Sequence, residues 1–142
     1  MSSFKAFDIA GSGMAAQSVR LNTTASNLAN ADSVSSTPAG VYKARHPIFE
    51  AVKATLAMQG SGAEAGPAVR VRGIYESTAP ATARYEPGNP LADAKGLVYA
   101  PAVNVVEEMV NMISASRSYQ NNVEVMNTSK ELLLATLRLG QG

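Results

Sequence analysis

A stripe of large side chains near the C-terminus constrains the fold of this chain more than any other feature. Asn104 in front of the stripe can cap a helix, with Glu107 three residues later as in a capping box, and Gly140 ends the pattern. The pattern predicts a helix within residues 104–142. Its members step by four and three residues, and all but two are apolar or aromatic: Val105, Met109, Met112, Ser116, Tyr119, Val123, Met126, Lys130, Leu133 and Leu137.

The length of this helix limits the shape of the molecule. A helix from Val105 to Leu139 has about 35 residues and is roughly 50 Å long. A compact globule of 142 residues would be less than about 40 Å across. Because the helix would project from such a globule, we expect an elongated molecule.

The N-terminal part of the sequence carries a matching pattern. Large residues recur every seven positions, and small or polar residues lie between them. The neighbouring face, with Gly11, Ser18 and Ala25, is small enough for another backbone to approach. We predict a helix within residues 1–33 that pairs with the C-terminal helix as a coiled coil. The large positions are Phe7, Met14, Leu21 and Leu28, and those between them are Ala10, Gln17 and Thr24.

Between the two helices, residues 34–103 read as loops and short strands. Residues 32–40 and 59–67 are rich in Ser, Pro and Gly, which is typical of loops. Short strands are expected within 41–52, within 68–76, from Thr82 up to the loop rich in Pro and Gly, and at 97–99, with a turn at Asp93–Gly96. The predicted fold class is mainly α with a small β-rich insert, an α+β chain.

Composition excludes several classes of function. The charge is low and nearly balanced, at net +1, whereas binding of nucleic-acid phosphates needs clustered Lys and Arg, so we expect no nucleic-acid partner. The chain has no cysteine and one histidine, His46, which argues against a metal site. No stretch approaches ~18 apolar residues, so no membrane-spanning helix is expected, and we see no cleavable signal peptide in the first residues.

One stretch matches the dinucleotide-binding fingerprint in sequence but not in its expected structural context. Residues 11–16, GSGMAA, fit G-x-G-x-x-A. The seven-residue spacing continues through these glycines, as it would in one unbroken helix. Each glycine should then weaken the helix by about 1 kcal/mol relative to alanine while allowing a bend or close packing. We therefore expect no cofactor and no enzymatic activity.

The C-terminal helix has more apolar surface than one partner helix can cover. Leucines in ELLLATLRLG project around most of the circumference, and a second stripe runs beside the main one at Val106, Val110 and Ile113. A helix that is apolar nearly all round is buried. Since the insert is small, we expect other protein chains to cover these faces.

Both terminal segments resemble those of a known family. DIAGSGMAAQSVRLNTTASNLANADS is similar to the N-terminal signature of flagellar rod and hook proteins, and NVVEEMVNMISASRSYQNNVEVMNTSKELL is similar to their C-terminal one. The short length and the junction from DAKGLVY to NVVEEM resemble proximal rod proteins more than the longer members. The sequence departs from the family at APAVNVV and at Gly11.

The resemblance implies a structural subunit of the flagellar basal body. Such subunits polymerise helically into the drive shaft that transmits torque across the periplasm, and their paired terminal helices line its inner tube. They leave the cell through the flagellar type III export apparatus without cleavage. The implied partners are copies of the chain, other rod subunits and that apparatus.

The stretch SNLANADS supplies the first interface candidates. Asn30 is expected to end the helix in the left-handed conformation. Asn27 is expected to tie the helix end to the backbone of the following segment or to a neighbouring subunit, which would fix the register. A solvated asparagine near a helix end is an equal alternative. For Arg117 and Tyr119, packing within the helix pair is an equal alternative. The candidate interface residues are Asn27, Leu28, Asn30, Met109, Met112, Arg117, Tyr119, Leu133 and Leu137.

Other functions remain as alternatives at this stage. A sister rod or hook-type protein would share the same signatures. A stand-alone coiled-coil adaptor would form a stable helical dimer at micromolar concentration, whereas a rod subunit would be weakly ordered until it assembles. A small nucleotide-binding enzyme would be stabilised by its ligand.

Overall fold

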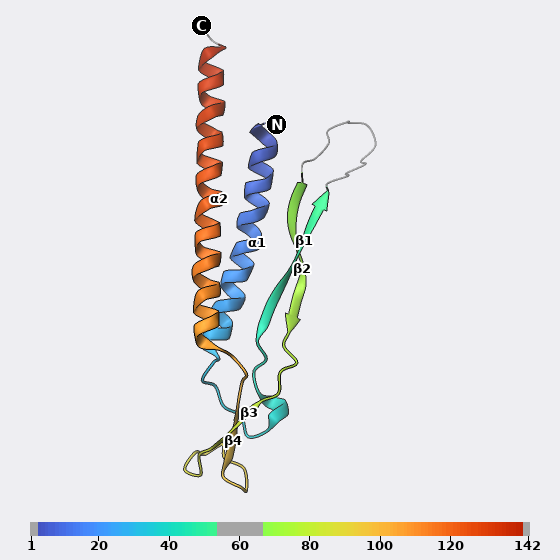
Figure 1. Ribbon diagram of the computed structural model, residues 1–142, viewed down its shortest axis with the longest axis vertical. Helices are drawn as coiled ribbons and strands as arrows, with labels where there is room; N and C mark the ends of the chain where they lie inside the picture. Colours follow the sequence, from blue (N-terminus) through green and yellow to red (C-terminus); the bar gives the residue numbers. More distant parts are fainter. Residues whose placement is uncertain (1–2, 54–66, 141–142) are drawn as a thin grey trace. The chain divides into compact units, whose positions relative to one another are not determined.

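The computed structural model of the chain describes residues 3–53 and 67–140 (Figure 1). Two long helices and two small sheets make an α+β fold, as the sequence predicts. Most of the loop expected at residues 59–67 lies outside the described residues. The elements in chain order are α1 (Ser3–Ala29), the 3₁₀ helix η1 (Pro38–Gly40), β1 (Arg45–Lys53), β2 (Pro67–Glu76), β3 (Thr82–Tyr85), β4 (Leu97–Ala100) and α2 (Val105–Leu139).

Helix α2 begins and ends where the sequence predicts. The side-chain oxygen of Asn104 accepts hydrogen bonds from the backbone N–H groups of Val106, at 3.1 Å, and Glu107, at 3.3 Å. These bonds satisfy two of the amides that a helix start leaves unpaired. The first turn carries Glu107 and Glu108, whose charges suit the positive end of the helix dipole. The predicted cap is therefore confirmed.

Helix α1 ends differently from the prediction. Among the described residues, Gly96 is the one with positive φ, so the left-handed cap expected at Asn30 is wrong. The side-chain amide of Asn30 instead donates to the carbonyl oxygen of Ser26 at 2.8 Å. The backbone continues through two further turns, with bonds from Ala31 to Leu28 and from Ser33 to Asn30. Because these bonds occupy the carbonyls at the helix end, no left-handed residue is needed there.

The strands form two separate two-stranded sheets. Strand β1 pairs with β2, and β3 pairs antiparallel with β4 with Thr82 opposite Ala100 and Tyr85 opposite Leu97. Ser35 makes a further antiparallel bridge to Tyr99. Within β4, Val98 is completely buried and Ala100 nearly so. The short strands thus contribute a small core of their own.

The described chain falls into two compact units, each of which contains part of both helices. The first combines Met1–Val19, Ile48–Gly73 and Ser114–Gly142, and the second combines Arg20–Pro47 and Ile74–Ile113. In the first unit, β2 reaches α1 through a bond from the N–H of Val69 to the hydroxyl of Ser12, at 3.1 Å. Both units therefore draw on residues from all three predicted segments.

The two helices contact each other in each unit and run antiparallel there. In the first unit, a Cβ built on Gly11 lies near Met126 and one built on Gly13 lies near Asn122. In the second unit, Arg20 bonds to Asn111 and Asn27 bonds to Glu108. In both units the α2 residue number falls as the α1 number rises, which is the antiparallel order.

The buried faces of the helices consist of small and polar residues. Of the predicted stripe on α2, Met112, Tyr119, Met126 and Leu133 are half-buried, whereas Val105, Met109, Lys130 and Leu137 are exposed. The most deeply buried positions of α2 are therefore not the large stripe but a neighbouring row of mostly smaller residues. Small side chains let two helices approach closely. The buried residues of the two helices are Ala10, Ala16, Thr23, Thr24, Asn27, Glu108, Ala115 and Ser129.

Candidate subunit-interface site

Asn27 is the centre of a buried polar network in the second unit. Its side chain is completely buried. The amide nitrogen donates to the carbonyl oxygen of Arg45 at 2.9 Å and to Oε2 of Glu108 at 3.0 Å. The amide oxygen accepts from the backbone N–H of Arg45 at 2.8 Å and from the hydroxyl of Tyr42 at 2.9 Å. Both donors and both acceptor positions of this amide are used.

The first alternative for Asn27 is therefore what the structure contains. Asn27 ties the end of α1 to the backbone of Arg45, the residue that begins β1. The hydroxyl groups of Tyr42 and Ser26 lie 3.0 Å apart, and the guanidinium of Arg45 lies 5.8 Å from the centre of the Tyr42 ring. These contacts hold the segment between α1 and β1 against the helix end.

Three members of this network were not among the predicted site residues: Tyr42, Arg45 and Glu108. Glu108 is the most distant of them in sequence from Asn27. Its side chain is 4% exposed, and it accepts the hydrogen bond from Asn27 across 81 positions of sequence. The ion pairs of the described chain, Arg45–Glu76 and Arg70–Glu50, do not include it. A buried carboxylate is costly unless it is hydrogen-bonded. Asn27 supplies a hydrogen bond, and the position of Glu108 in the first turn of α2 places its charge near the positive end of the helix dipole.

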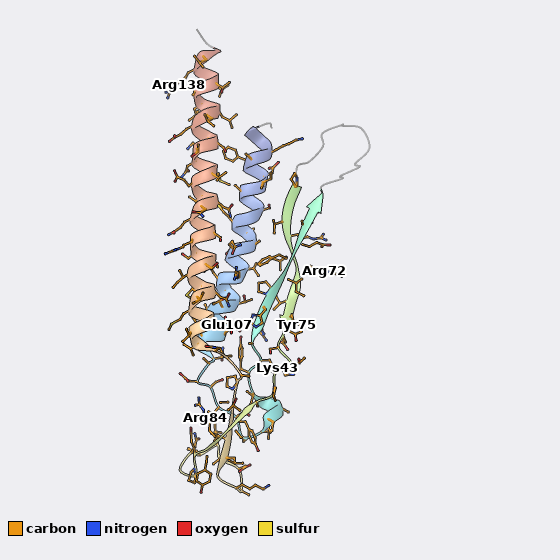
Figure 2. All side chains as sticks on the ribbon, viewed as in Figure 1. Lys43, Arg72, Tyr75, Arg84, Glu107 and Arg138 are labelled. Carbon is orange, nitrogen blue, oxygen red and sulfur yellow. The ribbon has the colours of Figure 1, made fainter. Side chains whose placement is uncertain are left out.

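Large apolar side chains gather on the exposed surface of α2. Figure 2 shows the side chains along this helix, with Glu107 labelled in its first turn and Arg138 in its last. Single exposed apolar residues are ordinary, but contiguous ones mark interaction surfaces. In the second unit the exposed residues are Val106, Met109, Val110 and Ile113. In the first unit, Leu134 and Leu137 are exposed on one side of the helix, and Leu132 and Leu139 on another. We call the first group the Val106 face, and the pair of Leu134 and Leu137 the Leu137 face.

The predicted interface residues differ in their exposure. The side-chain amide of Asn27 makes all of its hydrogen bonds within the chain. Met109, Arg117 and Leu137 are exposed, so they can meet another molecule. The remaining candidates are half-buried: Leu28, Asn30, Met112, Tyr119 and Leu133.

A second polar cluster closes the turn between β3 and β4. One carboxylate oxygen of Asp93 accepts from the backbone N–H groups of Lys95, at 2.8 Å, and Leu97, at 2.9 Å. The hydroxyl of Tyr99 donates to the other oxygen at 3.3 Å. The backbone bond from Leu97 is the largest influence that lowers the pKa of Asp93. Desolvation, followed by the charge of Asp93, raises the pKa of Tyr99. The predicted turn at Asp93–Gly96 is confirmed.

The structure also bears on three other kinds of site: a phosphate-binding loop, a metal site and a membrane-spanning helix. Residues 11–16 lie inside the unbroken helix α1, so the fingerprint is not a phosphate-binding loop. Within residues 3–53 and 67–140, no three His, Cys, Asp or Glu side chains are grouped so that they could hold a metal ion. No helix in this part of the chain is both long and apolar enough to cross a membrane.

Two family models match the ends of the chain. Residues 7–35 match the family described as flagella basal body rod protein, and residues 94–139 match the C-terminal family of the flagellar basal body rod FlgEFG proteins. The first match contains Asn27, and the second contains Glu108 and the exposed faces of α2.

Curated relatives resemble the chain over nearly its whole length. The flagellar basal-body rod protein FlgC of Escherichia coli O6:H1 is 56% identical over 95% of this chain and 96% of its own. FlgC of Yersinia enterocolitica is 55% identical over 99% of this chain and 100% of its own. FlgC of Borreliella burgdorferi is 34% identical over the full length of both. By this similarity, the chain belongs to the FlgC family of flagellar basal-body rod proteins.

Proposed function

We propose that this protein is a structural subunit of the rod of the bacterial flagellar basal body, and not an enzyme. Its relatives carry the name of basal-body rod proteins, and both of its terminal segments match rod-protein families. Within the rod, we place it in the proximal part. There it polymerises with copies of itself and with other rod subunits into the drive shaft that transmits torque across the periplasm.

The exposed apolar surface of α2 is the observation that carries this proposal. Val106, Val110 and Ile113 are 70%, 61% and 56% exposed, and Leu137 and Leu139 are 63% and 84% exposed. Burying one such aliphatic side chain contributes about 1.5–3 kcal/mol. Covering several of these residues with neighbouring protein chains would therefore stabilise the fold substantially. This supports assembly over a monomeric state.

The proposal includes a route and an arrangement. The terminal helices pair as a coiled coil in an elongated subunit and line the inner tube of the rod. The flagellar type III export apparatus delivers the chain without cleavage. The antiparallel helix contacts support the pairing, and close helix packing at Gly13 is compatible with it.

Two alternatives differ from this proposal in their support. A sister rod or hook-type protein is less well supported, because the similarity to proteins named FlgC extends over nearly the whole chain. A stand-alone coiled-coil adaptor would leave the Leu137 face exposed after dimerisation. The polymerising subunit accounts for both exposed faces.

Complementation of a bacterium that lacks its own FlgC tests the function. We expect the wild-type chain to restore swimming and to purify with basal bodies. Val110→Asp together with Ile113→Asp should abolish both, because two charges in the Val106 face would be buried without partners. The matched control is Gln120→Asp, at an exposed polar position of the same helix.

The two variants must be compared at equal cellular levels. If the aspartate pair swims as well as the control, the Val106 face is not an assembly surface. If the wild-type chain fails to enter basal bodies, the proposed function is wrong.

A further inference from the structure

Side-chain hydrogen bonds from Arg20 to Asn111 and from Asn27 to Glu108 join α1 and α2 in the second unit, and a shift of the helices would affect them differently. Seven residues beyond Asn111 lies Ser118, which also offers an acceptor oxygen. Along α2, the buried or half-buried positions Glu108, Ala115, Asn122 and Ser129 follow one another every seven residues. Met112, Tyr119, Met126 and Leu133, all half-buried, repeat with the same period. A face with this repeat presents nearly the same shape after a shift of seven residues.

The facing side of α1 has the same repeat. Phe7, Met14, Leu21 and Leu28 are half-buried and seven residues apart. Gly13, Arg20 and Asn27, also seven apart, each meet α2. Two faces with the same seven-residue period can slide by one period and still bring their rows of large, half-buried residues together. Shape and hydrophobic contact therefore do little to select one register.

Polar pairing breaks this equivalence in the second unit. In the observed register, the amide of Asn27 donates to the carboxylate of Glu108 at 3.0 Å, and both side chains are buried. A shift of seven residues would replace Glu108 by Ala115, which has no acceptor. Asn27 would lose a partner, and Glu108 would lose the donor that compensates its buried charge.

We propose that Asn27 and Glu108 together select the register of α1 against α2 and reject the register shifted by seven residues. The pair acts as a positioning device. Asn27 also holds the backbone of Arg45 and the hydroxyl of Tyr42, so the same contact decides where the segment leading to β1 joins the helices. This inference concerns the fold of one chain and does not depend on the proposed function.

Spin-label distances in the full-length protein test the inference, with labelled protein mixed into an excess of unlabelled protein at a concentration where the helical circular dichroism has reached its plateau. The chain has no cysteine, so Ala25→Cys and Glu107→Cys provide two labelling sites, both exposed and both in the second unit. We expect one narrow distance distribution in the labelled wild-type background. A register shift moves one label by about 10 Å along the helix axis. Asn27→Ala should therefore add a second, displaced distance population.

Matched variants separate register from stability. Glu108→Gln keeps an acceptor for Asn27 and should retain one distance, whereas Glu108→Ala should add the second population. Asn22→Ala, at an exposed asparagine of the same helix, should leave the distribution unchanged.

Several outcomes would overturn the register role. A single unshifted distance in both Asn27→Ala and Glu108→Ala would limit the pair to stability. A broad distribution in the wild-type background would mean that the pair does not define a register. Loss of helical circular dichroism in both alanine variants would assign the pair to folding as a whole.

Discussion

Gly11 and Gly13 lie two residues apart in α1 but have different surroundings. A Cβ built on Gly11 would lie 3.7 Å from the methyl carbon of Met126, an ordinary contact. A Cβ built on Gly13 would lie 2.8 Å from the side-chain nitrogen of Asn122, which is too close. The close helix packing expected at these glycines is therefore found at Gly13.

This difference predicts that alanine at the two positions will change the stability of the chain by different amounts. Gly11→Ala should stabilise the chain by about 0.5–1 kcal/mol, since alanine is the better helix former. Gly13→Ala should gain less or lose stability, because Asn122 must first turn away. Thermal unfolding followed by helical circular dichroism measures both. Equal melting temperatures for the two variants would contradict the tight contact at Gly13.

The Asp93 cluster predicts a dependence on pH at the β3–β4 turn. The folded state lowers the pKa of Asp93 below 3.8, mainly through the bond from the N–H of Leu97. The stabilisation by its carboxylate is therefore present above pH 3.8 and is lost as the pH falls through the lower folded value. The amide proton shifts of Lys95 and Leu97 should report this loss on acidification. Asp93→Asn should remove that acid transition, and its persistence in the variant would contradict the assignment.

Local polar signals were predictable from sequence at this scale, and distant ones were not. Asn104 and the Asp93 turn act within four residues of themselves, so the sequence pattern contains the whole interaction. Asn27 also stands out, but its partner Glu108 is 81 positions away and belongs to another element. The Asn30 prediction failed because its side chain and backbone made other local turns.

At the scale of elements, the β3–β4 hairpin depends on one glycine. Gly96 has φ of +74°, and a Cβ on it would lie 2.9 Å from the ring of Tyr85. Tyr85 is 71% exposed, so its ring can move aside. The backbone conformation cannot be relieved in the same way, because side chains disfavour positive φ.

Gly96→Ala should therefore destabilise the hairpin by about 1–2 kcal/mol. Gly88→Ala is the matched control, since nothing lies within 4 Å of its built Cβ and its φ is not positive. Amide hydrogen exchange along β3 and β4 measures both variants. Equal protection in the two would show that the conformation of Gly96 is not limiting.

The helix cap gives a second prediction for an element. Asn104→Ala removes the acceptor of the N–H groups of Val106 and Glu107 and should cost about 1 kcal/mol. Asn104→Ser should retain most of the stability, because serine also caps helices well. Thermal unfolding is the measurement. An alanine variant as stable as the serine variant would rule out a capping contribution.

Helix limits followed from the sequence more accurately than helix faces. Capping residues and a sustained period define where α2 begins and ends. Its buried face was harder to predict, because the large stripe and the small row of Glu108, Ala115 and Ser129 lie side by side. Hydrophobicity favours the large stripe, whereas close approach of two backbones favours the small row.

At the scale of the whole molecule, the distribution of side chains differs from that of most soluble proteins. The described core is largely alanine, with Val98 as its one larger aliphatic residue in residues 3–53 and 67–140. Many leucine, valine and isoleucine side chains are instead exposed on the surface. Most of the available apolar burial is therefore left for contacts between molecules.

This distribution predicts how the isolated protein responds to concentration. Dilute chain should have weak helical circular dichroism, which rises with concentration together with assemblies of no fixed size. Sedimentation velocity and circular dichroism over the same concentration range measure the two effects. A stable dimer that is fully helical at micromolar concentration would favour the coiled-coil adaptor instead.

The alanine-rich interior also affects which positions should be sensitive to substitution. In an enzyme of this size, harmful substitutions concentrate at positions hidden from water in the single molecule. Here, many of the sensitive positions should be ones that a lone copy exposes, because they are covered only after neighbours arrive. A mutational survey scored by swimming and one scored by the folding of single copies would then map to different sides of the same helix.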